Sequence, residues 1–325
     1  MSAGILLAPF KPGDQPALSS LLRPTGGDLC FCATWDDAQR RLATHPYSVL
    51  IVDYDQLGDD AVAFLDQVSV ANPELQIVVL SDERQRPHLT TLFGTRFLTH
   101  LLSRDLSLGS HDLVVTVQKL LPGSASNDQD VFGLEKYLPG QLTPLTPIQH
   151  TITGSRDKET VIQALEGFAE QRGVPSRLTR LACGVADEFV TNAVYNAPVD
   201  ANGNPKYALV PRGQHVLLQP DERVTMRYAS NGPLLAISVS DRFGALTVDT
   251  VQRYLAKCFA GGRDQIGSSS SGAGMGFYYI LTSLSQLIIN IAPGRQTEMI
   301  GVLDISGTYR TLMERPKSFN MFVTR

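Results

Sequence analysis

The sequence has few cysteines and no long hydrophobic run. It contains four cysteines in 325 residues, and Cys30 and Cys32 lack His or Cys partners at the spacing of a zinc site. No apolar run approaches the roughly 20 residues of a membrane span, and residues 1–9 lack the basic start of a signal peptide. These absences predict a protein of the reducing cytoplasm, without structural zinc and without a membrane anchor.

The sequence also has no excess of basic residues. It holds 28 Lys and Arg against 32 Asp and Glu, a net charge of -4. A protein that neutralises phosphates needs a Lys/Arg surface, so nucleic acid is not expected as the main partner, although a local basic patch stays open. The 43% of hydrophobic and 18% of charged residues fit a globular protein, and the length suffices for two domains.

Residues 1–122 alternate between strand-like and helix-like patterns, which predicts an α/β doubly wound parallel sheet. The expected strands are residues 4–8, 28–34, 48–53, 76–80 and 96–102. The expected helices are residues 36–44, with Asp36 as N-cap, 60–70 and 111–121. Residues 123–147 are rich in Pro, Gly and Ser and are predicted to be a linker.

Residues 148–325 place helices first and strands later, which predicts an α+β sandwich with a largely antiparallel sheet. The expected helices are residues 156–171, 177–195 and 275–284. The expected strands are residues 224–227, 234–240, 286–291, 298–305 and 318–323.

The helix 177–195 carries Glu188 and Asn192 four residues apart, on one side. They adjoin an apolar stripe of Leu178, Leu181, Ala182, Val185 and Phe189. Burying an Asn side chain without a hydrogen-bond partner costs about 1–3 kcal/mol of stability. A bound metal–nucleotide would supply such a partner. Asn offers an oxygen to Mg²⁺, and Glu can deprotonate a nucleophile. A capped or water-bonded Asn on a core helix is the alternative.

Two further segments suggest nucleotide binding. Asp241 ends a strand three residues before Gly244. A buried acid there can accept a hydrogen bond from the exocyclic amine of a base, while glycine lets the backbone approach a ring. Gly272, Gly274 and Gly276 lie where the chain enters the helix expected at residues 275–284, and backbone N–H groups at a helix N-terminus can bind phosphate. The alternatives are a strand-ending turn and a flexible Gly/Ser loop.

In order and spacing, these segments resemble the GHKL ATPase superfamily over residues 148–325. Glu188-x-x-x-Asn192-Ala193 matches the N-box, residues 241–245 resemble the G1 box and residues 272–276 the G2 box. The compact size and the helix 156–173 resemble the anti-sigma-factor serine kinases. Two departures are Phe243 at a usual glycine position and Asn196 where these kinases often have His.

The resemblance implies ATP and Mg²⁺ as ligands in a GHKL (Bergerat) fold. Asn192 would hold Mg²⁺ and Glu188 would be the general base. Asp241 would read adenine and Gly244 would line the base pocket. Gly272, Gly274 and Gly276 would wrap the phosphates, beneath a lid formed by residues 253–271.

The N-terminal domain resembles a response-regulator receiver with Asp53 at the end of its third strand. Residues 8–10 offer no acid for Mg²⁺ and residues 101–104 no Lys, although Ser81 matches the hydroxyl position. Without a metal site the phosphoryl charge has little stabilisation. We therefore expect a pseudo-receiver that docks partners or dimerises, with Asp53 as a phospho-acceptor the alternative.

Together the resemblances imply a bacterial signal-transduction protein of the two-component or partner-switching kind. The expected activity is ATP-dependent phosphorylation of Ser or Thr on an anti-sigma-antagonist-like or other signalling protein. The alternative is a nucleotide-sensing or degenerate scaffold that binds proteins without phosphoryl transfer. A homodimer stays open. A histidine kinase is disfavoured, because none of the six His lies in a dimerisation helix.

Overall fold

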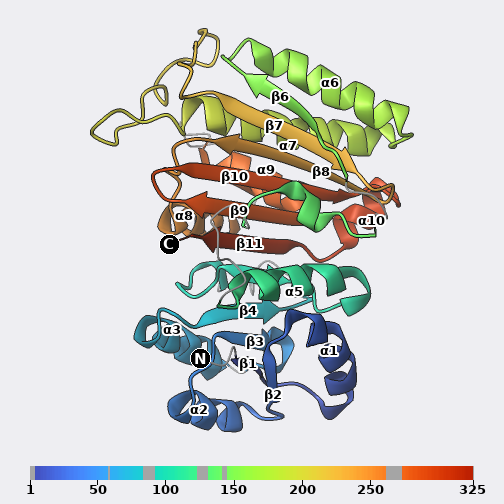
Figure 1. The fold of residues 1–325 in the computed structure, drawn as a ribbon, viewed down its shortest axis with the longest axis vertical. Coiled ribbons are helices and arrows are strands. Elements are labelled where there is room, and N and C mark those ends of the chain that lie inside the picture. The colour runs from blue at the N-terminus through green and yellow to red at the C-terminus, as the bar shows by residue number, and fades with distance from the viewer. Residues whose placement is uncertain are drawn as a thin grey trace. The chain divides into compact units, whose positions relative to one another are not determined.

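The computed structural model (Figure 1) describes residues 4–57, 59–82, 92–122, 131–140, 145–260 and 273–324. The chain divides into two compact units. Unit 1 comprises Met1–Val131, Gln252–Ser268 and Ser318–Asn320, and unit 2 comprises Phe132–Val251, Ser269–Lys317 and Met321–Arg325. The helix α8 (Val248–Ala260) and the strand β11 (Ser318–Val323) contribute residues to both.

Unit 1 is built on a parallel sheet in the order β2-β1-β3-β4-β5. Its strands are β1 (Gly4–Leu7), β2 (Asp28–Phe31), β3 (Val49–Asp53), β4 (Gln76–Leu80) and β5 (His100–Leu102). This order belongs to flavodoxin-like doubly wound sheets, in which ligands bind beyond the carboxyl ends of β1 and β3. The predicted parallel α/β sheet is therefore confirmed.

Helices pack on the sheet of unit 1 because their apolar faces need cover. They are α1 (Gln15–Leu22), α2 (Trp35–Thr44), α3 (Asp59–Ala71) and α5 (Leu106–Leu120), with the short 3-10 turns η1 (Pro12–Asp14), η2 (Arg23–Thr25) and η3 (Tyr54–Gln56). The side chains Leu18 of α1 and Leu113 and Val117 of α5 join the apolar cluster around Ile5 and Ile51.

Three local predictions in unit 1 need correction. The helix α1 was not predicted, because a short apolar segment between Pro12 and Pro24 gives little periodic signal. The strand β5 begins at His100 rather than at residue 96, because residues 95–99 form turns. The N-cap of α2 is Thr34 rather than Asp36, since the Thr34 hydroxyl accepts a hydrogen bond from the Asp37 amide at 3.3 Å.

Unit 2 is an α+β sandwich, as predicted. The strands β9, β10, β8, β7 and β6 follow one another in that order with every neighbouring pair antiparallel, and β11 lies next to β9. Their bounds are β6 (Ile148–Ile152), β7 (Val224–Ser230), β8 (Leu234–Asp241), β9 (Gln286–Ala292) and β10 (Gln296–Asp304). The sequence missed β6, because its side chains are mostly exposed and only Ile152 is buried.

Three helices contact this sheet or one another. They are α6 (Asp157–Gln171), α7 (Ser176–Tyr195) and α9 (Ala273–Ser283), beside the shorter α10 (Tyr309–Glu314) and η5 (Leu134–Tyr137). The helix α7 packs on β8, β7 and β10 and against α6 and α9. Its predicted apolar stripe is buried: Leu178, Leu181, Ala182, Val185 and Phe189 are each at most 9% exposed.

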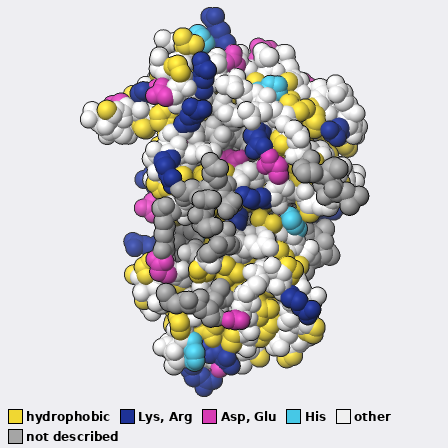
Figure 2. All heavy atoms as spheres, in the orientation of Figure 1, with side chains coloured by type: hydrophobic (Ala, Val, Ile, Leu, Met, Phe, Trp, Pro, Cys, Tyr) yellow, Lys and Arg dark blue, Asp and Glu magenta, His cyan; other side chains and the backbone are white. Residues whose placement is uncertain are grey.

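Charged side chains are dispersed on the face seen in Figure 2. Lys and Arg lie among acidic and hydrophobic side chains there and do not gather into one basic stripe. No helix in the described part of the chain is both long and apolar enough to cross a membrane.

Candidate functional site

Glu188 and Asn192 lie one turn apart near the C-terminal end of α7. Glu188 is half-buried. Burial raises the pKa of its carboxyl, the neighbouring Asp187 raises it further, and the cations Lys158 and Arg212 oppose the shift. Glu188 therefore holds its proton more tightly than an exposed glutamate, which suits an acid–base group working near neutral pH.

Asn192 has a protein partner within its own helix. Its side-chain oxygen accepts a hydrogen bond from Nδ2 of Asn196 at 2.9 Å, in an exposed position. The backbone oxygen of Asn192 accepts from the amides of Asn196 and Ala197 as the helix ends. The side chain is half-buried rather than buried in the apolar stripe, so its oxygen can turn toward a ligand at the cost of one exposed hydrogen bond, about 0.5–1.5 kcal/mol.

The backbone of α9 approaches the carboxylate of Glu188. A Cβ atom added to Gly276 would lie 2.6 Å from Oε2 of Glu188. On the same pair of helices, a Cβ added to Gly184 would lie 3.1 Å from Cζ of Tyr279. The close packing of α7 and α9 thus depends on one glycine from each helix.

The sequence suggested that the Gly-rich segment forms a loop before the helix. In the structure, the helix α9 already begins within this segment. Gly274 and Gly276 belong to the first turn of α9, which begins at Ala273, and Gly272 lies outside the described residues. Glycine is a poor helix former, so local propensity favoured a loop. The absence of a side chain at Gly276 leaves room for Glu188.

Asp241 and Gly244 form a tight turn after β8. Asp241 is 6% exposed, and its Oδ1 accepts hydrogen bonds from the amides of Phe243 at 2.8 Å and Gly244 at 3.2 Å. Burial raises the pKa of Asp241, and these backbone donors oppose the shift. The turn therefore occupies one carboxylate oxygen of Asp241.

Gly244 is required by the fold. Its φ is +56°, and an added Cβ would collide with the carbonyl oxygen of Ala292 and lie 2.9 Å from the amide nitrogen of Arg295. The turn between β9 and β10 therefore leaves no space for a side chain at residue 244. This packing explains the glycine without a bound base.

Two cations that the sequence did not single out lie near Glu188. Nζ of Lys158, on α6, forms an ion pair with Oδ1 of Asp187 at 2.8 Å and donates to Oγ1 of Thr191 at 3.4 Å. Arg212 stacks on the ring of Tyr195 at 4.1 Å from its centroid. Because these contacts join residues from different segments, no local spacing could reveal them.

Within the described residues, no group of three or more His, Cys, Asp or Glu side chains is placed to hold a metal ion. An Asn-based Mg²⁺ site differs from such a cage, because Mg²⁺ commonly takes one or two protein ligands and fills its shell with phosphate oxygens and water. Of the predicted lid, residues 253–260 form the end of α8, and residues 261–271 lie outside the described part.

The second candidate site is the carboxyl edge of the parallel sheet in unit 1. Asp53, fully buried at the end of β3, forms an ion pair through Oδ2 with Nε of Arg104 at 2.8 Å. A guanidinium nitrogen of Arg104 lies 3.4 Å from Oδ2 of Asp14, which ends η1 after β1. The Asp53 Oδ1 accepts a hydrogen bond from the amide of Asp55 at 3.2 Å.

The cluster brings together Asp14, Asp53 and Arg104, which are far apart in the sequence. Burial raises the pKa of Asp53 and Arg104 opposes the shift. Burial disfavours the charge on Arg104, but the carboxylates of Asp53, Asp14 and Asp55 together outweigh burial and raise the pKa of the guanidinium. Arg104 stands in the segment that lacks the expected Lys, and Asp14 supplies an acid that residues 8–10 do not. The predicted hydroxyl, Ser81, follows β4 at the same edge and is buried.

No protein-family model matches the sequence, and no curated protein matches it. The chain is similar to the solved signal receiver domain of an HD domain-containing protein from Pseudomonas fluorescens Pf-5, with 17% identity, 39% of this chain and 100% of that chain covered, and a TM-score of 0.34. It is also similar to a chain of the SiaB–SiaC complex from Pseudomonas aeruginosa, with 13% identity, 48% and 88% covered, and a TM-score of 0.33.

Proposed function

We propose that unit 2 is a Mg–ATP-binding domain of GHKL type, and that the chain is a signalling protein that phosphorylates a serine or threonine of a regulatory partner protein. The observation that carries this proposal is the contact between the half-buried carboxylate of Glu188 and the backbone of Gly276 in the first turn of α9. This contact places an acid–base group next to a helix N-terminus, where backbone N–H groups can bind phosphate.

The residues around this contact suit a metal–nucleotide. Asn192 would offer its side-chain oxygen to Mg²⁺, because that oxygen is bonded to an exposed amide that can be released. When bound, Mg²⁺ would neutralise phosphate charge. Lys158 and Arg212 supply positive charge on the side of Glu188, and Gly272, Gly274 and Gly276 would hold phosphate oxygens with their amides.

Glu188 would act as the general base. Its carboxylate takes the proton of the partner's hydroxyl as that oxygen bonds to the γ-phosphorus and the bond to the departing ADP oxygen breaks. A raised pKa brings the base closer to working pH, which strengthens it as a proton acceptor. Asp241 would accept a hydrogen bond from the adenine amine, in addition to those from the amides of Phe243 and Gly244 and from Thr297.

Calorimetry with a nonhydrolysable ATP analogue and Mg²⁺ tests the binding step. We expect binding in the micromolar range, lost in Asn192→Ala and kept in Glu188→Gln. Labelled ATP with a partner protein encoded beside this chain tests the transfer step. We expect phosphoserine or phosphothreonine on the partner, and a loss of at least 100-fold in Glu188→Gln. Failure of every such partner to accept phosphate would contradict the kinase assignment.

A second function is favoured by the turn after β8. Asp241 closes that turn and Gly244 packs on Ala292, so both residues have structural roles without a nucleotide. The alternative is a scaffold that binds regulatory proteins without phosphoryl transfer. The two assays together separate the functions. A chain that does not bind the analogue at millimolar concentration is a degenerate scaffold, and a chain that binds it but transfers no phosphate to a partner is a nucleotide-sensing scaffold.

A further inference from the structure

An arginine near Glu188 is held in place by a single tyrosine. The guanidinium of Arg212 lies over the ring of Tyr195, 4.1 Å from its centroid. The hydroxyl of the same Tyr195 donates to the carbonyl oxygens of Arg212 and Gln214, each at 3.4 Å. Tyr195 is buried at the end of α7. One fixed side chain therefore positions both the backbone and the guanidinium of Arg212.

Tyr195 lies on the side of α7 that carries the candidate site. Glu188, Asn192 and Tyr195 follow one another at spacings of four and three residues, so they share one side of the helix. Arg212 stacks at the end of this row. Its positive charge acts on the carboxyl of Glu188 and opposes the raised pKa of that group. Arg212 is thus a cation on the same side of α7 as the candidate general base.

The segment 197–223, which carries Arg212 between α7 and β7, is anchored on both sides of this residue. Before Arg212, Nζ of Lys206 pairs with Glu222, whose side chain is 1% exposed. After Arg212, the carbonyl oxygen of Val216 accepts a hydrogen bond from the amide of Ser155 at 2.9 Å. The backbone that carries Arg212 is therefore fixed before any ligand binds, which lowers the entropy cost of binding.

The two cations near Glu188 differ in how far their charge is neutralised. Lys158 forms an ion pair with Asp187 at 2.8 Å. Arg212 forms no ion pair with an acid in the part of the chain that the structure describes, and its side chain is exposed. Arg212 is therefore the cation of the two that keeps its charge for an incoming anion.

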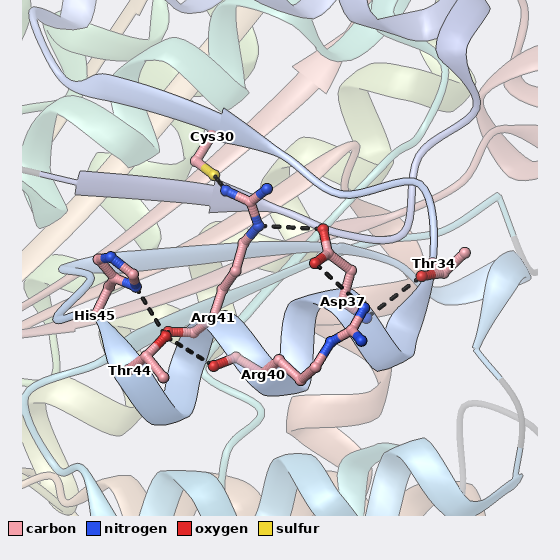
Figure 3. A network of polar contacts seen from close by, with 7 residues as sticks. All are labelled: Cys30, Thr34, Asp37, Arg40, Arg41, Thr44 and His45. Atoms are coloured by element: carbon pink, nitrogen blue, oxygen red, sulfur yellow. Dashed lines mark hydrogen bonds and ion pairs between the residues drawn. The ribbon is translucent and has the colours of Figure 1, made fainter.

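Arginines in unit 1 show how a carboxylate occupies a guanidinium. In Figure 3, Asp37 contacts both Arg40, at 3.6 Å, and Arg41, at 3.1 Å. The contact of Arg212 is of another kind, because an aromatic ring covers the flat face of the guanidinium and leaves its N–H edge available. Phosphate oxygens bind such an edge through two parallel hydrogen bonds.

The position of Glu188 decides which phosphate of a nucleotide Arg212 can bind, and this step rests on the function proposed above. A general base must lie within hydrogen-bond distance of the hydroxyl that attacks the γ-phosphorus. The terminal phosphate would therefore lie beside Glu188. We propose that Arg212 binds the terminal phosphate of ATP and is the residue by which this chain distinguishes ATP from ADP.

Calorimetry of the full chain tests the proposal, with Mg²⁺ and either a nonhydrolysable ATP analogue or ADP. We expect the unaltered chain to bind the analogue about 10-fold more tightly than ADP, because ADP lacks the phosphate that accepts hydrogen bonds from Arg212. Arg212→Gln should weaken binding of the analogue about 10-fold and binding of ADP less than about twofold.

Arg172→Gln is the matched control. Arg172 also stacks on an aromatic ring of unit 2, that of Phe168 at 4.3 Å, but it is not among the charges that act on Glu188. This variant loses the same kind of contact at a different place. It should therefore leave both affinities unchanged.

The outcomes separate this inference from the proposed function. An unaltered chain that binds neither nucleotide at millimolar concentration overturns both. An unaltered chain that binds the two nucleotides equally well overturns the inference alone. So does Arg212→Gln if it keeps the preference for the analogue, or if it loses both nucleotides to the same extent while circular dichroism shows a folded chain.

Arg212→Lys replaces Arg212→Gln if circular dichroism shows that the glutamine variant does not fold. Lysine keeps the positive charge but lacks the planar fork that binds phosphate through two hydrogen bonds. The proposal then requires a smaller preference for the analogue over ADP than in the unaltered chain, and an unchanged preference overturns it.

Discussion

The carboxylate of Asp53 accepts a hydrogen bond from Nε of Arg104 at 2.8 Å, and this pair occupies the carboxyl edge of the parallel sheet in unit 1. In a doubly wound sheet this edge is where ligands bind. Asp53 is fully buried, whereas Arg104 is 28% exposed at its side chain. The buried carboxylate of Asp53 therefore needs Arg104 to compensate its charge, whereas water can partly solvate the charge of Arg104.

Arg104→Ala should destabilise unit 1 by about 2–4 kcal/mol, because it leaves a buried carboxylate without its cation. Urea denaturation followed by circular dichroism measures the loss. The double variant Asp53→Asn with Arg104→Ala should recover at least half of it, since a neutral amide needs no counter-charge. If the double variant is as unstable as Arg104→Ala or less stable, the pair does not account for the loss.

Asp53 should resist phosphorylation. One oxygen of Asp53 is paired with Arg104 and the other accepts the Asp55 amide, so neither is free to attack a phosphoryl donor without breaking a contact. We expect acetyl phosphate and Mg²⁺ to leave the mass of the unaltered chain unchanged at Asp53. Stoichiometric Mg²⁺-dependent modification of Asp53 would restore the receiver hypothesis.

The stability of unit 2 should depend on pH through Glu188. Its pKa in the folded chain is raised above the ordinary 4.5, so the folded state binds the proton more tightly than the unfolded chain. Glu188 has no effect on stability below pH 4.5 and lowers stability as the pH rises from 4.5 through the folded pKa. Glu188→Gln does not titrate and should remove this decline.

Chemical denaturation between pH 4 and pH 8 checks this expectation. The free energy of unfolding of Glu188→Gln minus that of the unaltered chain should increase with pH and then level off. A flat difference for Glu188→Gln would mean that its carboxyl titrates in the folded chain as it does in the unfolded chain.

Gly244→Ala should be strongly destabilising, by about 2–4 kcal/mol, because it adds a collision with the Ala292 carbonyl to the strain of a positive φ. The matched control is Gly294→Ala. Gly294 also has a positive φ, +69°, but an added Cβ there meets nothing within 4 Å. The control should therefore cost about 1–2 kcal/mol, the strain alone. Thermal unfolding of the two variants measures the difference, and equal losses would remove the packing explanation.

Gly276→Ala should impair phosphoryl transfer more than stability. The added Cβ would lie 2.6 Å from the far end of the Glu188 side chain, which can move aside, so the carboxylate is displaced while the fold persists. Gly167→Ala on α6, where an added Cβ meets nothing within 4 Å, should stabilise by about 0.5–1 kcal/mol and leave transfer unchanged. Normal transfer by Gly276→Ala would show that the position of Glu188 does not matter.

The sequence predicted those parts of the fold in which local pattern and burial agree. The runs that became β3 and β4 are continuous apolar strands, and the stripe from Leu178 to Phe189 has helical spacing. Prediction failed where the side chains of an element are mostly exposed or where its residues have a low propensity for that element. The strand β6 shows mostly exposed side chains, and α9 begins among glycines that are individually poor helix formers.

The candidate site in unit 2 and the Asp53 cluster in unit 1 could likewise be predicted only in part from the sequence. Glu188, Asn192 and Gly276 could be proposed from spacing, and the structure brings Glu188 and Gly276 into contact. The partners Lys158, Arg104 and Asp14 could not be found, because each meets its counterpart across a long stretch of chain. The ligand roles assigned to Asn192 and Asp241 stay predictions.

The two glycines between α7 and α9 have a mechanical consequence. The Tyr279 side chain of α9 packs against Gly184 of α7, and the Glu188 side chain of α7 packs against Gly276 of α9. With no spare volume at either place, α9 cannot slide along α7 without pushing on both side chains. A movement that pushes the first turn of α9 toward α7 therefore presses on the Glu188 carboxylate.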